Sequence, residues 1–210
     1  MENSYDGGAR ARLISVARKL FAEQGFAGTS TRDIAKTSGL NVSLISYYFG
    51  GKEGLYKAVL AEFAESAQAR MTELLEPFNM ENLNKESFKQ AMRVFLQGML
   101  PYKFAMPEIN ILLNREMMAG LPYARDLFNN VFAVIVERMV SIYQAGQNKG
   151  FVRKDIHPYV LFLSMVHSTD IYMNLCNCGT SVANKVPQLP RDMDQYVEQI
   201  YLIFVEGVLI

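Results

Sequence analysis

Apolar residues recur three or four positions apart along nearly the whole chain, which is the spacing of one face of an α-helix. No stretch shows the sustained polar and apolar alternation, bounded by turn residues, that predicts strands. Glycine or proline lies close to most of the interruptions in this pattern. The sequence therefore predicts an all-α fold of about nine helices. We expect them at 10–24, 31–37, 42–49, 52–76, 85–104, 107–119, 122–149, 157–176 and 191–209.

The two shortest predicted helices, 31–37 and 42–49, are joined by a turn that contains Gly39. Thr29, Ser30 and Thr31 offer N-terminal caps for the first, and Asn41 offers one for the second. An amphipathic helix precedes the pair and a long helix follows it, which is the arrangement of a helix-turn-helix. Of the second short helix only Ile45 and Phe49 face inward, so its other side chains lack a core of their own.

The residues of this segment form a specific pattern. It reads Leu20-Phe21, Gly25-Phe26, Thr29 to Ala35, Ser38 to Asn41, Ile45 to Phe49, Lys52-Glu53 and Leu55. This pattern resembles the N-terminal signature of the TetR/AcrR family of transcription regulators and covers about a quarter of the chain. The sequence departs from the common family pattern at Ser46, where many members have Tyr, and at Gly50-Gly51, where polar residues are more usual.

The resemblance implies that specific side chains bind operator DNA. Arginine can donate two hydrogen bonds to guanine, and aliphatic side chains can contact the thymine methyl group. Tyrosine hydroxyls and a helix N-terminus suit phosphate. Arg32 could instead be a solvated neighbour of Asp33, and one of the two tyrosines could pack against the first helix. The implied DNA-binding residues are Thr31, Arg32, Val42, Ser43, Leu44, Tyr47, Tyr48 and Lys52.

The region after residue 54 has no comparable signature, but the resemblance implies an effector site there. Flexible methionines and aromatic side chains gather in its middle helices and suit a pocket for a largely apolar ligand. The same residues at helical spacing also describe an ordinary core. Arg115 is a further polar candidate, and His167 could equally be satisfied by Asp170 on its own helix. The candidate ligand-binding residues are Met99, Phe104, Asn110, Asn114, Met117, Met118, Phe128, Phe132, His167 and Asp170.

The two C-terminal helices, 157–176 and 191–209, carry apolar residues on more than one side, so both need a partner beyond their own domain. A four-helix homodimer interface would supply it. Twofold symmetry then predicts a palindromic operator. We expect residues 1–54 to form the DNA-binding domain and residues 55–210 the effector-binding and dimerisation domain.

Charge and composition support this interpretation without deciding it. The formal net charge is zero over 210 residues, but residues 1–52 carry seven basic and four acidic side chains. The basic excess thus lies at the helix-turn-helix end. No secretory leader or membrane-spanning run is present, which favours a cytoplasmic protein without a membrane partner. Cys176 and Cys178 lack the further ligands of a zinc site and favour neither metal nor redox chemistry.

The favoured function is a repressor that a small, largely apolar effector releases from DNA. An activator of the same fold is the alternative. An enzyme or a small-molecule carrier is disfavoured because the chain has only two histidines, no nucleophile and base at catalytic spacing and no glycine-rich phosphate loop. No cofactor is expected.

Overall fold

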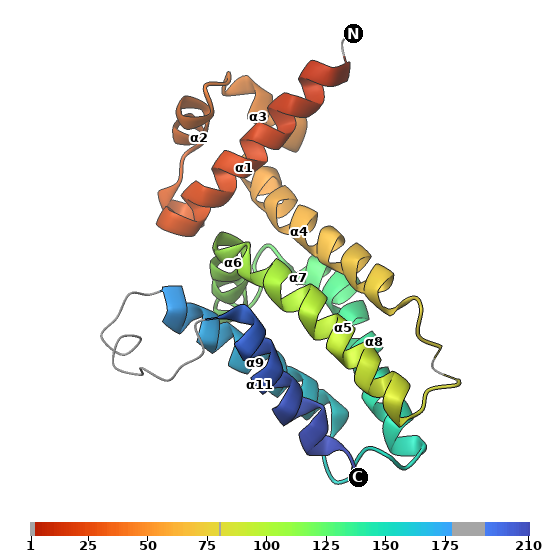
Figure 1. Cartoon of the computed structure of the whole chain (residues 1–210). Coiled ribbons are helices and arrows are strands. Elements are labelled where there is room, and N and C mark those ends of the chain that lie inside the picture. The colour runs from red at the N-terminus through yellow and green to blue at the C-terminus, as the bar shows by residue number, and fades with distance from the viewer. Residues whose placement is uncertain (1–2, 80, 178–191) are drawn as a thin grey trace. The chain divides into compact units, whose positions relative to one another are not determined.

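A computed structural model describes residues 3–79, 81–177 and 192–210. These residues are helical apart from their connections and contain no strand, only an isolated bridge between Val152 and Leu209 (Figure 1). The elements are α1 (Asn3–Gly28), α2 (Thr31–Ser38), α3 (Ser43–Phe49), α4 (Lys52–Leu75), α5 (Lys85–Phe104), α6 (Pro107–Met118), α7 (Arg125–Leu127), η1 (Phe128–Phe132), α8 (Ala133–Asn148), α9 (Pro158–Asn177), α11 (Met193–Phe204) and η2 (Glu206–Val208). None of the helices described is long and apolar enough to cross a bilayer.

Most predicted helices are confirmed to within a few residues, and three differ. The first begins at Asn3 rather than near residue 10, and Gly25 interrupts it with a φ of 75°. The predicted helix 122–149 is divided into α7, the π-helical turn η1 and α8. The predicted helix 191–209 ends at Phe204 and continues as a 3₁₀ turn. The long loop expected at 177–190 lies almost wholly outside the described residues, as does Cys178, whereas Cys176 is an exposed free thiol.

The chain divides into two compact units, which do not follow the boundary at residue 54. The first consists of residues 1–66 and 106–131, and the second of residues 67–105 and 132–210. Helix α6, which the sequence places in the effector region, thus belongs to the same unit as the helix-turn-helix. Within the first unit, α1 packs on both α2 and α6. Its core includes Leu13, Ala17, Phe21, Ile34, Ile45, Leu55 and Tyr56.

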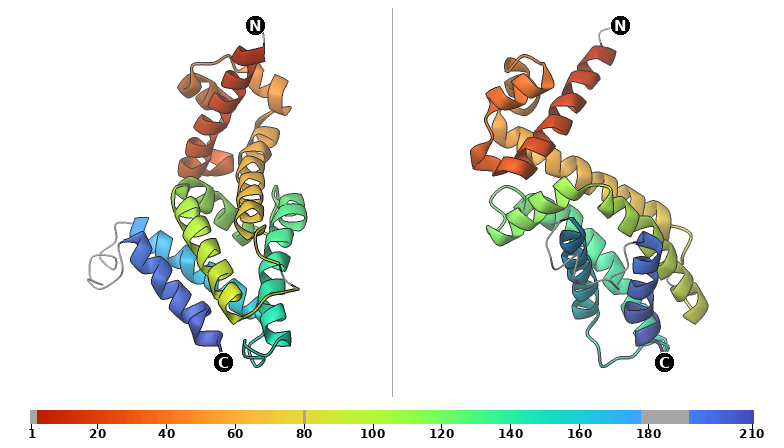
Figure 2. Two further views of the ribbon diagram at one scale, coloured as in Figure 1. Left: turned by 45° about the vertical axis from the view of Figure 1, so that its right-hand side comes forward. Right: turned by 60° about the vertical axis from the view of Figure 1, so that its left-hand side comes forward.

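The second unit is a bundle in which α8 packs on α9 and α5 packs on α11 (Figure 2). Tyr143 is fully buried in α8, and its hydroxyl donates to the Phe204 carbonyl at 3.0 Å. Because burial disfavours the phenolate, the pKa of Tyr143 is raised well above its ordinary value. The hydroxyl therefore stays a donor and ties α8 to the end of α11.

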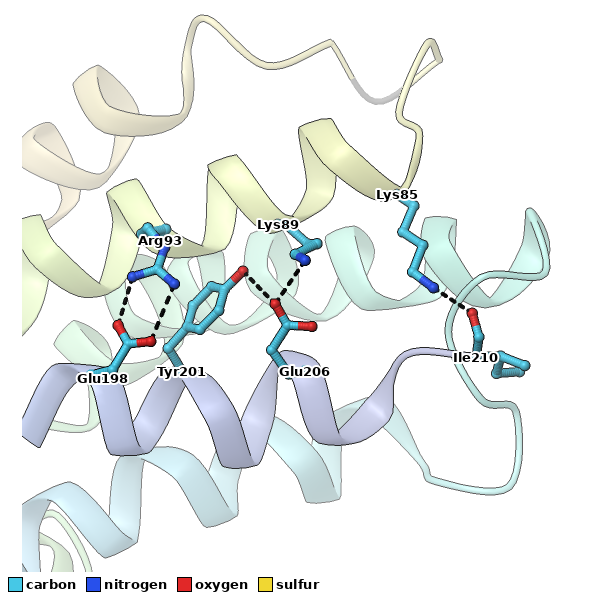
Figure 3. Close-up of polar contacts among 7 residues, drawn as sticks. All are labelled: Lys85, Lys89, Arg93, Glu198, Tyr201, Glu206 and Ile210. Atoms are coloured by element: carbon cyan, nitrogen blue, oxygen red, sulfur yellow. Dashed lines mark hydrogen bonds and ion pairs between the residues drawn. The ribbon is translucent and has the colours of Figure 1, made fainter.

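A row of basic residues on α5 fastens α11 and the segment after it (Figure 3). Arg93 pairs with Glu198 at 2.7 Å and lies over the ring of Tyr201, and Lys89 pairs with Glu206 at 2.8 Å. Lys85 donates to the carbonyl of Ile210. Hydrogen bonds from Arg93 and Lys89 hold the pKa values of both glutamates below their ordinary range. This row fixes α11 against α5 along its length.

Gly54, in the first turn of α4, sets how closely α3 and α4 approach. A Cβ atom there would lie 1.7 Å from the carbonyl oxygen of Phe49, the last residue of α3. No rotamer change can relieve this contact because both atoms belong to the backbone or are fixed to it. Glycine at position 54 is therefore a packing requirement for the helix that follows α3.

We expect Gly54→Ala to lower the free energy of unfolding by about 1–3 kcal/mol, because the backbone must shift to admit the methyl group. The matched control is Gly28→Ala in the same unit, where the new Cβ would meet only the Gln24 Cβ at 3.5 Å. The control should change stability by less than about 0.5 kcal/mol. Urea unfolding of both variants measures the difference. Equal stability of the two variants would contradict the close approach.

Candidate nucleic-acid interface

Helix α2 begins with a capping box that sequence alone specifies. The Ser30 side chain accepts from the backbone N–H of Asp33 at 3.1 Å, and the Asp33 carboxylate accepts from the N–H of Ser30 at 3.2 Å. The Ser30 hydroxyl also donates to the Asp33 carboxylate, and this hydrogen bond, followed by the one from the Ser30 N–H, lowers the pKa of Asp33. Gly39 ends the helix in the left-handed conformation, with a φ of 67°. Asp33 is thus committed to the cap, while the neighbouring Arg32 is exposed and makes no ion pair with any described side chain.

Helix α3 is fixed at both ends and anchored by one residue. Asn41 accepts from the backbone N–H and the hydroxyl of Ser43, both at 2.9 Å, which confirms its predicted capping role. Gly50 ends the helix with a φ of 71°. Ile45 is fully buried, whereas Phe49 is only half-buried. The helix therefore has a short core-facing side and a wide outer side.

The outer side of α3 presents apolar and hydroxyl groups to solvent. Val42 is 43% exposed and Tyr47 is 75% exposed, and Ser43 is exposed beside them. Leu44 is half-buried. The Ser43 hydroxyl hydrogen points to Asn41, which leaves its oxygen lone pairs to accept from outside the protein. These side chains have little role in holding the fold, so they are available for contact with a base edge.

The two tyrosines are not equivalent. Their rings meet edge to face with centroids 5.0 Å apart, and the Tyr48 ring also lies 6.0 Å from Phe49. Tyr48 is half-buried. Its packing partners thus include Phe49 of its own helix. Tyr47 is the tyrosine whose hydroxyl is the more open to a phosphate. Thr31, in the first turn of α2, is half-buried.

Lys52 has partners that the resemblance does not suggest. Its ammonium group donates to the carbonyl of Phe26 at 2.9 Å and to that of Thr29 at 3.0 Å, and it lies 4.4 Å from the Phe26 ring centroid. Two of its three donors are therefore directed into the turn between α1 and α2. In this structure the Lys52 side chain helps to position α2 and α3, and only its remaining donor is available to a phosphate.

Other side chains from distant elements converge on the same turn. The last carbonyls of a helix have no partner within it. Thr29 is buried at the turn, and its hydroxyl, which has a single hydrogen, lies within hydrogen-bond reach of the Leu20 and Gly25 carbonyls, at 3.1 and 2.9 Å. Arg115 of α6 donates to the carbonyl of Phe21 at 2.9 Å. Arg115 thus has a structural partner, in place of the ligand-orienting role considered from its polarity alone.

Glu116, next to Arg115, has a structural role that the sequence does not reveal. It is buried, and its carboxylate accepts from the backbone N–H groups of Tyr123 and Ala124, both at 3.0 Å. The Tyr56 phenol of α4 lies beside it, and its pKa is raised chiefly by burial and then by the Glu116 charge. Glu116 therefore fixes the turn after α6, where Leu121 has a left-handed φ of 62°. An isolated Glu inside an amphipathic helix gives no signal for this role.

The predicted ligand-binding residues are dispersed between the two units. Asn110, Asn114, Met117, Met118 and Phe128 belong to the first unit, and Met99, Phe104, Phe132, His167 and Asp170 to the second. Met118 is 91% exposed and Met117 is also exposed, so neither is enclosed within its unit. Asn110 is buried and donates to the carbonyl of Met106 at 3.2 Å.

In the second unit, Asp170 pairs with Lys103 of α5, not with His167. The alternative of a His167–Asp170 pair is therefore wrong, because His167 lies on the exposed side of α9. Phe104 lies near Tyr172 and Tyr196, with ring centroids 5.7 and 6.2 Å away. These two tyrosines stack on each other at 3.7 Å. Phe104 and Asp170 are thus two predicted ligand-binding residues that lie in the same part of the second unit.

Comparison with known proteins shows which family the helix-turn-helix segment resembles. The family described as bacterial regulatory proteins, tetR family, matches residues 13–59. The HTH-type transcriptional regulator RutR of Escherichia coli K12 is 28% identical over 197 residues, which cover 93% of this chain and 88% of RutR. The HTH-type transcriptional repressor NicS of Pseudomonas putida is 29% identical over 168 residues, 75% of this chain and 74% of NicS. The chain thus carries the N-terminal segment of this family and is similar to two HTH-type regulators over most of its length.

Solved structures of regulators share the fold of this chain. The ketosteroid transcriptional regulator KstR2 of Mycobacterium tuberculosis superposes with a TM-score of 0.69 at 19% identity, covering 99% of this chain and 96% of KstR2. A regulator from Saccharomonospora viridis, solved in complex with choline, gives a TM-score of 0.71 at 17% identity, covering 97% and 99% of the two chains. The similarity to RutR and NicS makes the chain a DNA-binding transcriptional regulator, and its matched segment runs from α1 through α2 and α3 into the first part of α4.

We expect Lys52→Met to weaken DNA binding on the order of tenfold, equivalent to about 1.4 kcal/mol, without changing the salt dependence. The reason is that the lost contacts are carbonyls of the protein, not phosphates. Thr29→Val is the matched variant because it loosens the same turn and, being buried, cannot touch DNA. Fluorescence anisotropy across a salt series measures both. If only Lys52→Met lowers the slope of log affinity against log salt by about 0.9, its ammonium contacts a phosphate.

Proposed function

We propose that the protein is a homodimeric repressor that binds a palindromic operator and is released from it by a small effector. The observation that carries the DNA-binding part is the outer side of α3. The helix is fixed at both ends and by one buried residue, but the side chains on its outer side are exposed to solvent. Val42, Ser43 and Leu44 are proposed to contact base edges, with Arg32 reading a further base. Thr31, Tyr47 and Tyr48 are proposed to bind phosphates, as are the backbone N–H groups at the start of α4, while the Lys52 side chain stays bound to the turn.

The dimer part rests on the exposed apolar surface of the second unit. Val160, Leu163, His167 and Ile171 follow one another along one face of α9 at helical spacing and are all exposed. Leu202 and Ile203 of α11 are exposed as well. Apolar residues on both helices would be covered by the same helices of a second copy. Two reading heads related by a twofold axis require a palindromic operator.

The effector part rests on the aromatic neighbourhood of Phe104 in the second unit. Phe104, Tyr172 and Tyr196 offer flat apolar surface, and the Lys103–Asp170 pair beside them is mostly buried. Aromatic surface with a few polar groups is typical of small-molecule sites. We propose that this region, together with Met99 and Phe132, binds the effector. NicS is named as a repressor, which favours repression over activation here.

The effector signal would reach the helix-turn-helix along the chain, because α5 ends at Phe104 and α6 begins three residues later at Pro107. Helix α6 belongs to the first unit and holds the end of α1 through Arg115. A ligand that favours another position of α6 would move the turn that Lys52 and Thr29 also hold. A differential binding energy of about 1–3 kcal/mol is a typical coupling. We propose the division at residue 54 for function, with residues 1–54 binding DNA and residues 55–210 binding the effector.

We expect Arg32→Ala to relax the preference at one base-pair position of the half-site, because a bidentate contact contributes about 1–3 kcal/mol of discrimination. Lys36→Ala is the matched control, since Lys36 lies on the same helix and is exposed without an assigned base. Selection of binding sites from a random duplex library by each protein measures the preference. Loss of preference at no position in the Arg32 variant would contradict a base-reading role.

We expect Leu163→Glu to shift the protein from dimer to monomer, because a buried charge in the proposed interface has no partner. Val134→Glu is the control, because Val134 is similarly exposed on α8 but lies outside the proposed interface. Light scattering after size exclusion gives the mass of each variant. A dimer that survives Leu163→Glu would place the interface elsewhere. Operator affinity should fall together with dimer content.

A further inference from the structure

Two arginines of α1 lie against the helix-turn-helix and were not among the DNA-binding residues implied by the resemblance. Arg10 and Arg12 are both exposed. The Arg10 guanidinium lies 5.4 Å from the ring centroid of Phe49, the last residue of α3. The Arg12 Nη2 atom lies 3.5 Å from where a Cβ of Gly39 would be, in the turn before α3. The two cations therefore lie at opposite ends of the segment that contains the reading helix.

Neither guanidinium is neutralised by a described carboxylate. The ion pairs among the described residues involve Lys57, Lys89, Arg93, Lys103 and Arg153, but neither of these arginines. Asp33, an acidic group of α2, is occupied by the capping box with Ser30. The five donors of each guanidinium are consequently open to an external acceptor.

The spacing fits the DNA backbone better than a single small anion. A helix of the length of α3, at about 1.5 Å per residue, spans roughly 10 Å. The major groove that would receive it is about 12 Å wide and is bordered on both sides by phosphates. Cations held beside the two ends of α3 would thus face phosphates rather than the base edges between them. Guanidinium binds phosphate through two parallel hydrogen bonds, and the Phe49 ring restricts the positions that Arg10 can take.

We propose that Arg10 and Arg12 bind phosphodiester groups that flank the bases read by α3. This rests on the proposed DNA-binding function and adds a sequence-independent contact from α1. The two arginines contribute to affinity for every DNA sequence and leave the choice of sequence to α2 and α3. The DNA-binding surface accordingly begins before residue 13, upstream of the family match.

The test uses the full chain with Arg10→Met and Arg12→Met, singly and combined. Methionine keeps an apolar stem against Phe49 but removes the charge. The probes are the duplex that the wild-type protein selects from a random library and calf-thymus DNA. We expect each single variant to lower the slope of log affinity against log salt by about 0.9, and the double variant by about 1.8. Affinity should fall by the same factor on both probes.

Lys19→Met is the matched control because Lys19 is exposed on the same helix, with no contact to α3 among the described residues. It should leave the slope at the wild-type value. Unchanged unfolding midpoints and dimer mass show that the variants are folded. A double variant with the wild-type slope, or one that loses affinity for the selected duplex alone, would overturn the proposal. Wild-type protein that selects no sequence would instead overturn the proposed function itself.

Discussion

The backbone carbonyls at the end of α1 are the constraint on which the first unit depends. The interruption of α1 at Gly25 leaves carbonyl oxygens without helical partners, and leaving such groups buried and unpaired costs about 1–3 kcal/mol each. Here they accept from Thr29 and from Arg115 of α6, while Lys52 of α4 holds the carbonyls just beyond. Three elements far apart in sequence are thereby fixed around one turn. Since α2 starts directly after that turn, its orientation follows from these bonds.

Features that depend on neighbouring residues could be predicted from the sequence. The capping box at Ser30, the left-handed Gly39 and the Asn41 cap each involve residues no more than about four positions apart, and the apolar period identifies Ile45 as the buried anchor of α3. The fold class and the start of most helices follow from the same local signals. The reading segment is the part of the chain where such signals are densest, which is why it could be recognised.

Features that depend on distant contacts could not be predicted. The donors of Lys52 reach residues more than twenty positions earlier, and Arg115 reaches one more than ninety positions earlier. A pattern that assigns Lys52 to phosphate carries no information about competing acceptors within the protein. The same limit applies to Asp170, for which a partner on its own helix is the local choice but Lys103 of α5 is the actual one. The π-helical turn at Phe128–Phe132 also leaves the apolar period almost unchanged.

The exposed and the buried residues of the helix-turn-helix are therefore subject to different physical constraints. Ile45, Gly54 and Thr29 are fixed by contacts of the backbone or the core, so a change there alters the position of α3 as a whole. Val42 and Tyr47 are mostly free of such contacts, so a change there alters only what the helix presents. A substitution on the outer side of α3 can therefore change the contacts of the helix with little loss of stability, whereas a substitution at Ile45, Gly54 or Thr29 cannot.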